Sequence, residues 1–312
     1  MADRIVDVVA GVLLRPDGAF FMASRPEGKV YAGYWEFPGG KVEPGEARYA
    51  ALVRELHEEL GIEVQRATPW LTQVFAYPHA TVRLNFFLVH HWLGAPHPKE
   101  GQQFAWQTAG DLSVSPVLPA NTPIFRALAL PAYYAITNAG ELGVDEQLRR
   151  LDSALSNGVR LIQVREKQLP MPERLTFAKA VVALARPHQA KVFFNGSLEE
   201  ALEVGADGLH LTSTALHQYT TRPAIEWVGA SCHHAADLLQ AKQLGVDYAL
   251  LGSVLPTLSH PDGQVLGWDA FRALHAEGWP LPIYALGGMT PTMLADAQGY
   301  GAHGVAMQRQ IW

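Results

Sequence analysis

The second half of the chain alternates strand-like and helix-like segments, and this pattern restricts its fold more than any other feature. Eight short apolar runs indicate strands, at 133–137, 159–165, 191–195, 208–211, 226–231, 247–252, 282–286 and 303–307. Helical patterns lie between them, at 145–156, 172–186, 198–204, 235–244, 268–276 and 291–298, with a weaker connection at 213–219. Eight strands alternating with helices predict a closed (β/α)8 barrel. Since such barrels usually take about 250 residues, this one is expected to be compact.

The first part of the chain has a different, α+β pattern. Apolar runs at 5–14, 19–23, 70–77 and 82–92 predict strands, the last being rich in β-branched and aromatic residues. The clearest helix runs over 47–60, where apolar residues recur at helical spacing, and Gly61 stands where a glycine would end it.

A break in composition near residue 130 predicts two domains, 1–130 and 131–312. Residues 115–123 (SPVLPANTP) are proline-rich and predict a loop, and 124–130 predict a short closing helix. Pro131 then precedes the first strand of the barrel.

Composition excludes several classes of protein. The chain has 312 residues, a net charge of −6 and a pI of about 6.1, which disfavours a large nucleic-acid-binding face. With Cys232 as the single cysteine, no internal disulfide can form, and we expect a protein of the reducing cytoplasm. The N-terminal apolar run contains an acid and predicts a strand rather than a signal peptide. No run approaches the roughly 18 apolar residues of a membrane span.

A dense acidic pattern lies within the predicted helix of the first domain. Residues 40–62 follow G-x5-E-x7-R-E-U-x-E-E-x-G-U, where U is aliphatic. Glu55, Glu58 and Glu59 are spaced i, i+3 and i+4, so they share one helical face, where they repel each other unless a cation binds. Hard oxygen ligands favour Mg²⁺, with Mn²⁺ as the alternative. A solvated acidic helix face is the competing interpretation, but Glu46, Arg54 and the preceding glycines in register disfavour it.

This segment resembles the Nudix box over its full length. The resemblance implies an α/β/α sandwich and Mg²⁺-dependent attack of water on the diphosphate linkage of a nucleotide. It also implies a set of metal ligands, namely the Gly39 carbonyl, Glu55, Glu58 and Glu59, with Arg54 and Glu46 completing the catalytic group.

Three further segments resemble the MutT branch of that family, the 8-oxo-dGTP diphosphatases. They are WEFPGG at 35–40, KEGQ at 99–102 and LPAN at 118–121. The resemblance implies that Asn121 reads the oxidised guanine through its amide, although an ordinary turn residue is the alternative. It further implies that Phe37 stacks near the base, that Arg25 contacts the nucleotide, and that Glu100 is an additional metal ligand or base. Ala80 departs from a polar residue of the branch.

Chemically useful residues stand at the predicted carboxyl ends of the barrel strands, where barrel enzymes keep their sites. They are Arg165, Lys167, Asn195, His210, His233, Thr257, Gly287 and Gly288. The two glycines precede a predicted helix and suit a phosphate, and the two basic residues suit a second anionic group.

The barrel half resembles the thiamine-phosphate synthase/TenI family, through QVREK at 163–167, DGLHL at 207–211 and ALGGM at 285–289. Gly196 and Ala215 stand where the synthase has magnesium-binding aspartates, and its basic residue after P-T-x-T is missing. The TenI branch lacks those aspartates and uses a histidine, for which His233 is the candidate. A thiazole tautomerase and a non-catalytic module that binds thiazole or thiamine phosphate both remain open.

The leading hypothesis is a Mg²⁺-dependent hydrolase that cleaves 8-oxo-dGTP to its monophosphate and diphosphate, cleansing the nucleotide pool and preventing mutation. The main enzymatic alternative is hydrolysis of thiamine-pathway diphosphates by the Nudix site, with the barrel binding the product. We expect neither nucleic acid nor membrane as a partner.

Overall fold

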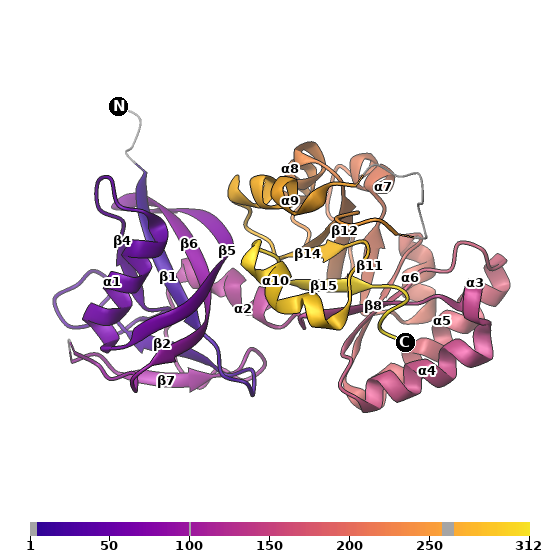
Figure 1. Cartoon of the computed structure of the whole chain (residues 1–312), viewed down its shortest axis with the longest axis horizontal. Coiled ribbons are helices and arrows are strands. Elements are labelled where there is room, and N and C mark those ends of the chain that lie inside the picture. Colours follow the sequence, from indigo (N-terminus) through magenta and orange to yellow (C-terminus); the bar gives the residue numbers. More distant parts are fainter. Residues whose placement is uncertain (1–4, 100, 258–264) are drawn as a thin grey trace. The chain divides into compact units, whose positions relative to one another are not determined.

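The computed structural model describes residues 5–99, 101–257 and 265–312, which form two compact units (Figure 1). One unit holds the N-terminal part of the chain as far as Ala129, together with Gly278–Pro280, and the other holds the remainder. We propose 1–130 and 131–312 as the two domains.

Two sheets and two helices build the first unit. One sheet has the order β4-β1-β6-β5 and the other β3-β2-β7. The strands are β1 (Val6–Leu13), β2 (Phe20–Ser24), β3 (Trp35–Glu36), β4 (Gly39–Lys41), β5 (Glu63–Tyr77), β6 (Ala80–Leu93) and β7 (Phe104–Gln107). The helices are α1 (Arg48–Leu60) and α2 (Thr122–Leu128), with a short 3-10 turn, η1 (Pro119–Asn121), before the second.

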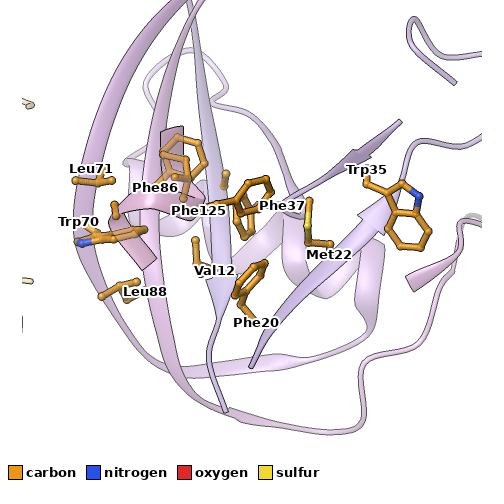
Figure 2. Close-up of a cluster of buried hydrophobic side chains, with 13 residues drawn as sticks. Val12, Phe20, Met22, Trp35, Phe37, Trp70, Leu71, Phe86, Leu88 and Phe125 are labelled. Carbon is orange, nitrogen blue, oxygen red and sulfur yellow. The ribbon is translucent and has the colours of Figure 1, made fainter. Parts of the chain in front are cut away.

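Each helix covers a different hydrophobic core, and the strands separate the two. Along β1, Val9 and Leu13 pack with the buried side of α1, whereas Ala10 and Val12 pack with α2, because successive side chains of a strand point to opposite faces. Figure 2 shows the second cluster, in which Phe20, Phe37, Phe86 and Phe125 lie together. This arrangement agrees with the predicted α/β/α sandwich.

Helix α1 has one buried stripe and one acidic side. Ala51, Leu52, Leu56 and Leu60 are buried, which leaves the glutamates of the same helix on the open side. The helix ends at Gly61, whose φ of 69° lies in the left-handed region that favours glycine. The sequence pattern thus places the acidic residues at the edge of the sheet, beside β4.

The second unit is a closed eight-stranded parallel barrel, which confirms the predicted fold class. Its strands are β8 (Tyr133–Ile136), β9 (Leu161–Val164), β10 (Lys191–Phe194), β11 (Gly208–Leu211), β12 (Trp227–Cys232), β13 (Tyr248–Gly252), β14 (Ile283–Leu286) and β15 (Gly304–Met307). Its helices are α3 (Ala139–Leu142), α4 (Val144–Ser156), α5 (Met171–Ala185), α6 (Leu198–Val204), α7 (Ser213–Gln218), α8 (Ala235–Leu244), α9 (Gly267–Ala276) and α10 (Leu294–Gly299), with 3-10 turns η2 (Arg186–His188) and η3 (Pro291–Met293). None of the helices described is both long and apolar enough to cross a membrane.

A polar network runs through the barrel interior. The Tyr134 and Tyr248 hydroxyls lie 2.5 Å apart, and His210 Nδ1 lies 3.0 Å from the Tyr248 hydroxyl. The Nε2 atom of His210 is 2.9 Å from Ser231 Oγ. The side chains of Tyr134, Tyr248, His210 and Ser231 are therefore hydrogen-bonded to one another, as a dry interior requires.

Two buried histidines of this unit predict a loss of stability in mild acid. Burial and the nearby Arg165 lower the pKa of His210 to about 3, and burial lowers the pKa of His303 to about 4. Because an unfolded histidine titrates near 6.5, the stabilisation is complete above that pH and is lost as the pH falls toward 4. Each neutral histidine should cost about 2 kcal/mol of stability at pH 5 relative to pH 7.5.

Urea unfolding of the full chain at the two pH values measures this loss. His303→Gln should lose about 2 kcal/mol less than the wild type between pH 7.5 and pH 5. His188→Gln, which alters a half-exposed histidine of η2, is the matched control and should follow the wild type. An equal loss in all three proteins would contradict the assignment.

Candidate functional site

The acidic site of the first unit depends on two glycines of β4. A Cβ atom on Gly40 would lie 2.2 Å from the Glu55 carboxylate, and one on Gly39 would lie 2.1 Å from the Val9 carbonyl oxygen. Only glycine therefore lets the strand approach both β1 and the acidic side of α1. The structure thus accounts for the two glycines by close packing on both sides of β4.

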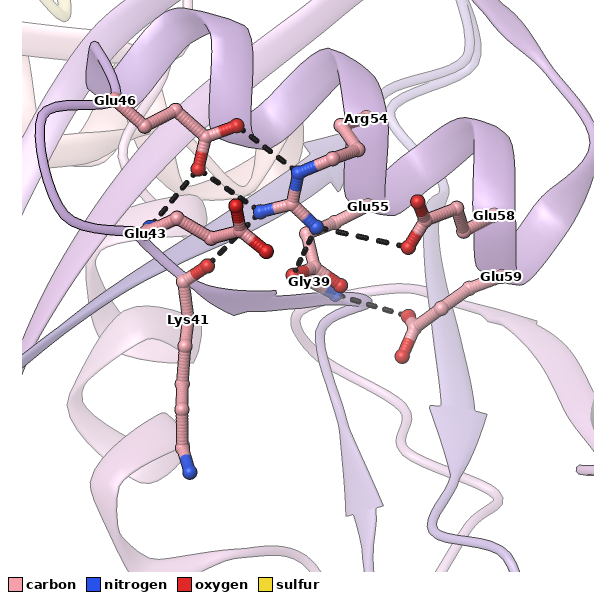
Figure 3. A network of polar contacts seen from close by, with 8 residues as sticks. All are labelled: Gly39, Lys41, Glu43, Glu46, Arg54, Glu55, Glu58 and Glu59. Atoms are coloured by element: carbon pink, nitrogen blue, oxygen red, sulfur yellow. Dashed lines mark hydrogen bonds and ion pairs between the residues drawn. The ribbon is translucent and has the colours of Figure 1, made fainter.

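Arg54 is the centre of the polar network around these glutamates (Figure 3). Its Nε and Nη2 atoms donate to the two oxygens of Glu46, both at 2.9 Å, and Nη1 donates to Glu55 Oε1 at 2.8 Å. Nη2 also donates to the Lys41 carbonyl oxygen at 3.1 Å. The guanidinium thus joins the loop before α1 to the helix itself.

The charge state of this network is well defined. The hydrogen bonds from Arg54, and then one from the Glu43 backbone, lower the pKa of Glu46 to about 2. The same pairing raises the pKa of Arg54, first through Glu46 and then through Glu55. Glu46 is therefore an anion that orients Arg54 across the neutral pH range, which suits a positioning role.

The remaining two glutamates point toward the same region from the last turns of α1. Glu59 Oε2 accepts a hydrogen bond from the Gly39 backbone N–H at 3.1 Å, so the last glutamate of the pattern touches the glycine loop. Glu58 is 60% exposed, and its carboxylate lies 3.6 Å from Arg54. All the predicted helix acids thus lie around the start of β4.

The donor set fits a hard divalent cation. Carboxylate oxygens and a backbone carbonyl are the ligands that Mg²⁺ and Mn²⁺ prefer, and Gly40 leaves the space that the Glu55 carboxylate occupies. Within the described ranges, no three acidic, histidine or cysteine side chains converge closely enough to hold an ion, because Arg54 engages Glu55 while Glu59 turns to Gly39. Glu100 lies outside the described residues.

The three predicted nucleotide contacts lie in different environments. Asn121, the last residue of η1, is 4% exposed, and its side-chain amide forms no hydrogen bond with any residue that the structure describes. Arg25 pairs through Nη1 with both oxygens of Glu36 at 2.8 Å and donates from Nε to the Val30 carbonyl oxygen at 2.7 Å. Within the described ranges, its Nη2 atom takes part in none of these bonds.

Phe37 belongs to the hydrophobic core. Its ring is 3% exposed and contacts Phe20, Phe86 and Phe125 at centroid distances of 5.7, 6.0 and 5.8 Å. The ring thus has no open face for a base, and we propose that Phe37 forms the floor beneath the base site rather than a stacking platform.

Glu36 is a site residue that the sequence did not single out. Burial raises its pKa, and pairing with Arg25 opposes that rise. The sequence signal was a glutamate between the apolar residues Trp35 and Phe37. Since Trp35 is buried and Glu36 half-buried in the same short strand, the carboxylate needs a partner.

Two cations, Arg165 and Lys167, follow β9 at the barrel mouth. Burial lowers the pKa of Arg165, and burial followed by repulsion from Arg165 lowers that of Lys167. Neither side chain forms an ion pair with a described residue. Two cations at one mouth, of which Arg165 is half-buried and Lys167 is exposed, favour an anionic ligand.

Other predicted mouth residues have defined contacts. His233 Nδ1 lies 2.6 Å from the Gly252 carbonyl oxygen, so Nδ1 carries the proton and Nε2 is left as the basic nitrogen. Asn195 Nδ2 donates to the His210 carbonyl oxygen at 3.0 Å. Gly287 and Gly288 have φ values of 99° and 68°, so the turn after β14 requires glycine. Thr257 follows β13.

Gly196, which stands where the synthase has a magnesium-binding aspartate, lies in crowded surroundings. A Cβ atom there would lie 2.4 Å from Glu200 Oε2 and from the Phe194 ring. Glu200 in turn accepts from the Ser197 backbone N–H at 2.8 Å and pairs with Arg174. An aspartate at 196 would therefore require the Glu200 and Phe194 side chains to shift, and Glu200 is already paired with Arg174. The Ser231–His210 pair, whose histidine the sequence placed at the mouth, is instead part of the interior network.

Comparisons with known proteins place both halves in families. The thiamine monophosphate synthase family model matches residues 133–311, and the NUDIX domain model matches residues 9–127. The chain belongs to the thiamine monophosphate synthase family and carries a Nudix hydrolase domain at its N-terminal side.

Particular relatives match each half over nearly their whole length. A putative thiamine-phosphate synthase 2 of Aquifex aeolicus is 33% identical over 181 residues, covering 57% of this chain and 96% of the relative. The 8-oxo-dGTP diphosphatase of Haemophilus influenzae is 37% identical over 128 residues, covering 41% of this chain and 94% of the relative. That of Escherichia coli is 34% identical over 123 residues, covering 39% and 95%.

Proposed function

We propose that the Nudix domain hydrolyses 8-oxo-dGTP to 8-oxo-dGMP and diphosphate. The observation that carries this proposal is the position of Asn121, which is 4% exposed in η1 and whose side-chain amide bonds to no described residue. Oxidation at C8 of guanine turns N7 into an N–H donor and adds a carbonyl acceptor. An amide offers the complementary acceptor and donor, so the Asn121 side chain can bond both groups of the oxidised base.

The acidic site would perform the cleavage. Gly39, Glu55, Glu58, Glu59 and Glu100 would hold Mg²⁺ or Mn²⁺, which when bound neutralises phosphate oxygens and lowers the pKa of a bound water. Arg54, fixed by Glu46, holds the Glu55 carboxylate at the edge of the site. Arg25 Nη2 would contact the nucleotide while its other nitrogens hold Glu36 and the Val30 carbonyl.

Steady-state kinetics on the purified full chain test this function. We expect kcat/KM for 8-oxo-dGTP to exceed that for dGTP, thiamine diphosphate and hydroxymethylpyrimidine diphosphate. Equal values for 8-oxo-dGTP and dGTP would defeat the substrate assignment. A preference for either of the other two diphosphates would instead support the thiamine-pathway alternative.

For the barrel, we propose a binding site for thiazole phosphate or thiamine phosphate. The specific observation is the pair of cations Arg165 and Lys167, neither of which forms an ion pair with a described residue, at the same end of the barrel as Gly287 and Gly288. The lack of a carboxylate at Gly196 and the pairing of Glu200 with Arg174 argue against a magnesium diphosphate there. The basic Nε2 of His233 suits proton transfer on the bound thiazole.

Calorimetry with each phosphate on the full chain tests the barrel site. Arg165→Ala should weaken binding about 10-fold or more, since it removes a charge-assisted contact, whereas exposed Arg149→Ala should not. Binding without tautomer exchange would identify a binding module, and exchange lost in His233→Ala would identify a tautomerase. Failure of both phosphates to bind would overturn the site.

A further inference from the structure

Four aromatic side chains from two separate segments meet on the Nudix domain. Tyr31 and Tyr34 come from the loop between β2 and β3, and Tyr77 and His79 come from the β5–β6 hairpin. The Tyr31 ring lies 5.2 Å from Tyr34, 5.6 Å from Tyr77 and 6.1 Å from His79, measured between centroids. We call these four residues the aromatic cluster. Tyr31 joins the two segments, because it contacts rings from both.

The backbone holds Tyr31 in place at a cost. Its φ is 61°, in the left-handed region that residues with a Cβ rarely adopt, so surrounding contacts must maintain it. The Tyr34 N–H donates to the Tyr31 carbonyl oxygen at 3.1 Å. Arg25, bonded to Glu36, also holds the preceding carbonyl of Val30. These contacts thus fix the loop to Arg25 and Glu36 before any ligand binds.

The loop of the aromatic cluster leads into a strand that bonds to the turn of Asn121. The Leu118 N–H donates to the Trp35 carbonyl oxygen at 3.0 Å, and the Asn121 N–H donates to the Leu118 carbonyl oxygen at 2.9 Å. Burial raises the pKa of the Tyr77 hydroxyl, and a hydrogen bond from the backbone of Ala120, the neighbour of Asn121, opposes that rise. The charges of Glu36 and Arg25 also act on this hydroxyl. Tyr31, Tyr34 and Tyr77 are each only half-buried, so ring surface remains open beside the buried amide.

We propose that Tyr31 and Tyr77 together form a stacking surface, called the clamp below, for one face of the base of the bound nucleotide. This inference rests on the proposed function, because it assigns the face of the base whose edge Asn121 reads. Ring stacking recognises the π-face that every base has, so the clamp supplies affinity without distinguishing oxidised from ordinary guanine. Phe37, the aromatic residue suggested by sequence, is buried in the core and leaves this role to the aromatic cluster.

Two variants test the clamp on the full chain. Tyr31→Gly removes the ring while keeping the left-handed backbone accessible, and Tyr77→Leu replaces a ring by an aliphatic side chain. Each should raise KM for both 8-oxo-dGTP and dGTP about 10-fold, with kcat and the ratio between the substrates nearly unchanged. Tyr31→Phe should retain the wild-type KM. Tyr49→Leu, which removes a ring that packs on Phe87, is the matched control.

The outcomes separate the clamp from the proposed function. If the wild type prefers 8-oxo-dGTP but neither variant changes KM, the clamp is wrong and the function stands. If the wild type has no such preference and both variants raise KM for dGTP, the clamp stands and the substrate assignment falls. A selective loss of 8-oxo-dGTP binding in Tyr77→Leu would overturn the clamp. Stacking should not distinguish the two bases, so Tyr77 would then act through Asn121.

Discussion

Replacing Glu55 or Glu59 with glutamine is expected to lower kcat for nucleotide hydrolysis about 1,000-fold. Glutamine keeps the length and shape of the side chain but removes the negative charge that a divalent cation requires. The two residues act from different places, since Glu55 lies against Gly40 and Glu59 bonds to the Gly39 N–H. Both substitutions should therefore impair the same site, although one acts beside Gly40 and the other beside Gly39.

The fold should survive these substitutions. Like charges at i and i+4 destabilise a helix by roughly 0.2–0.5 kcal/mol, and Glu55→Gln removes one such repulsion, with Glu59. Thermal unfolding should change little while turnover disappears. Glu63→Gln, at the exposed start of β5, is the control for loss of a carboxylate in the same domain and should retain full activity. Turnover of Glu59→Gln within twofold of the wild type would rule out its place at the centre of the site.

The elements with strong periodicity could be predicted from the sequence alone. Helix α1 and the eight barrel strands have regular apolar patterns, and both were predicted within a few residues. The strands β3, β4 and β7 were not, because they have two to four residues each and exist through pairing with β2 and β1. Their formation is a tertiary effect that no local pattern encodes.

The candidate site was predictable where spacing alone fixes geometry. Arg54 and the helix glutamates follow from positions along one helix, and Figure 3 shows them around the start of β4. The environment of Phe37 does not follow, since its burial depends on Phe86 and Phe125, which are distant in sequence. Likewise, the crowding around Gly196 comes from the side chains of Glu200 and Phe194 and could be found only with side chains in place.

Replacing Asn121 with alanine is expected to lower the preference for 8-oxo-dGTP over dGTP about 10- to 100-fold. The amide lies in a buried turn without a partner in the described part of the chain, so its hydrogen-bonding capacity is available to the ligand. A site built to hydrogen-bond a substrate group discriminates strongly against analogues that cannot complete those bonds. Alanine removes the donor and the acceptor together, while the acidic site that cleaves the diphosphate stays intact.

Asn121→Asp separates the two halves of this recognition. The carboxylate keeps two acceptors but loses the amide donors, so it can still accept from the N7–H that only the oxidised base carries. We therefore expect Asn121→Asp to retain part of the preference that Asn121→Ala loses, with kcat for dGTP similar in both. Ratios of kcat/KM for 8-oxo-dGTP and dGTP measure the effect. If both variants keep the wild-type ratio, Asn121 is only a turn residue before α2, and the base must be read elsewhere in the domain.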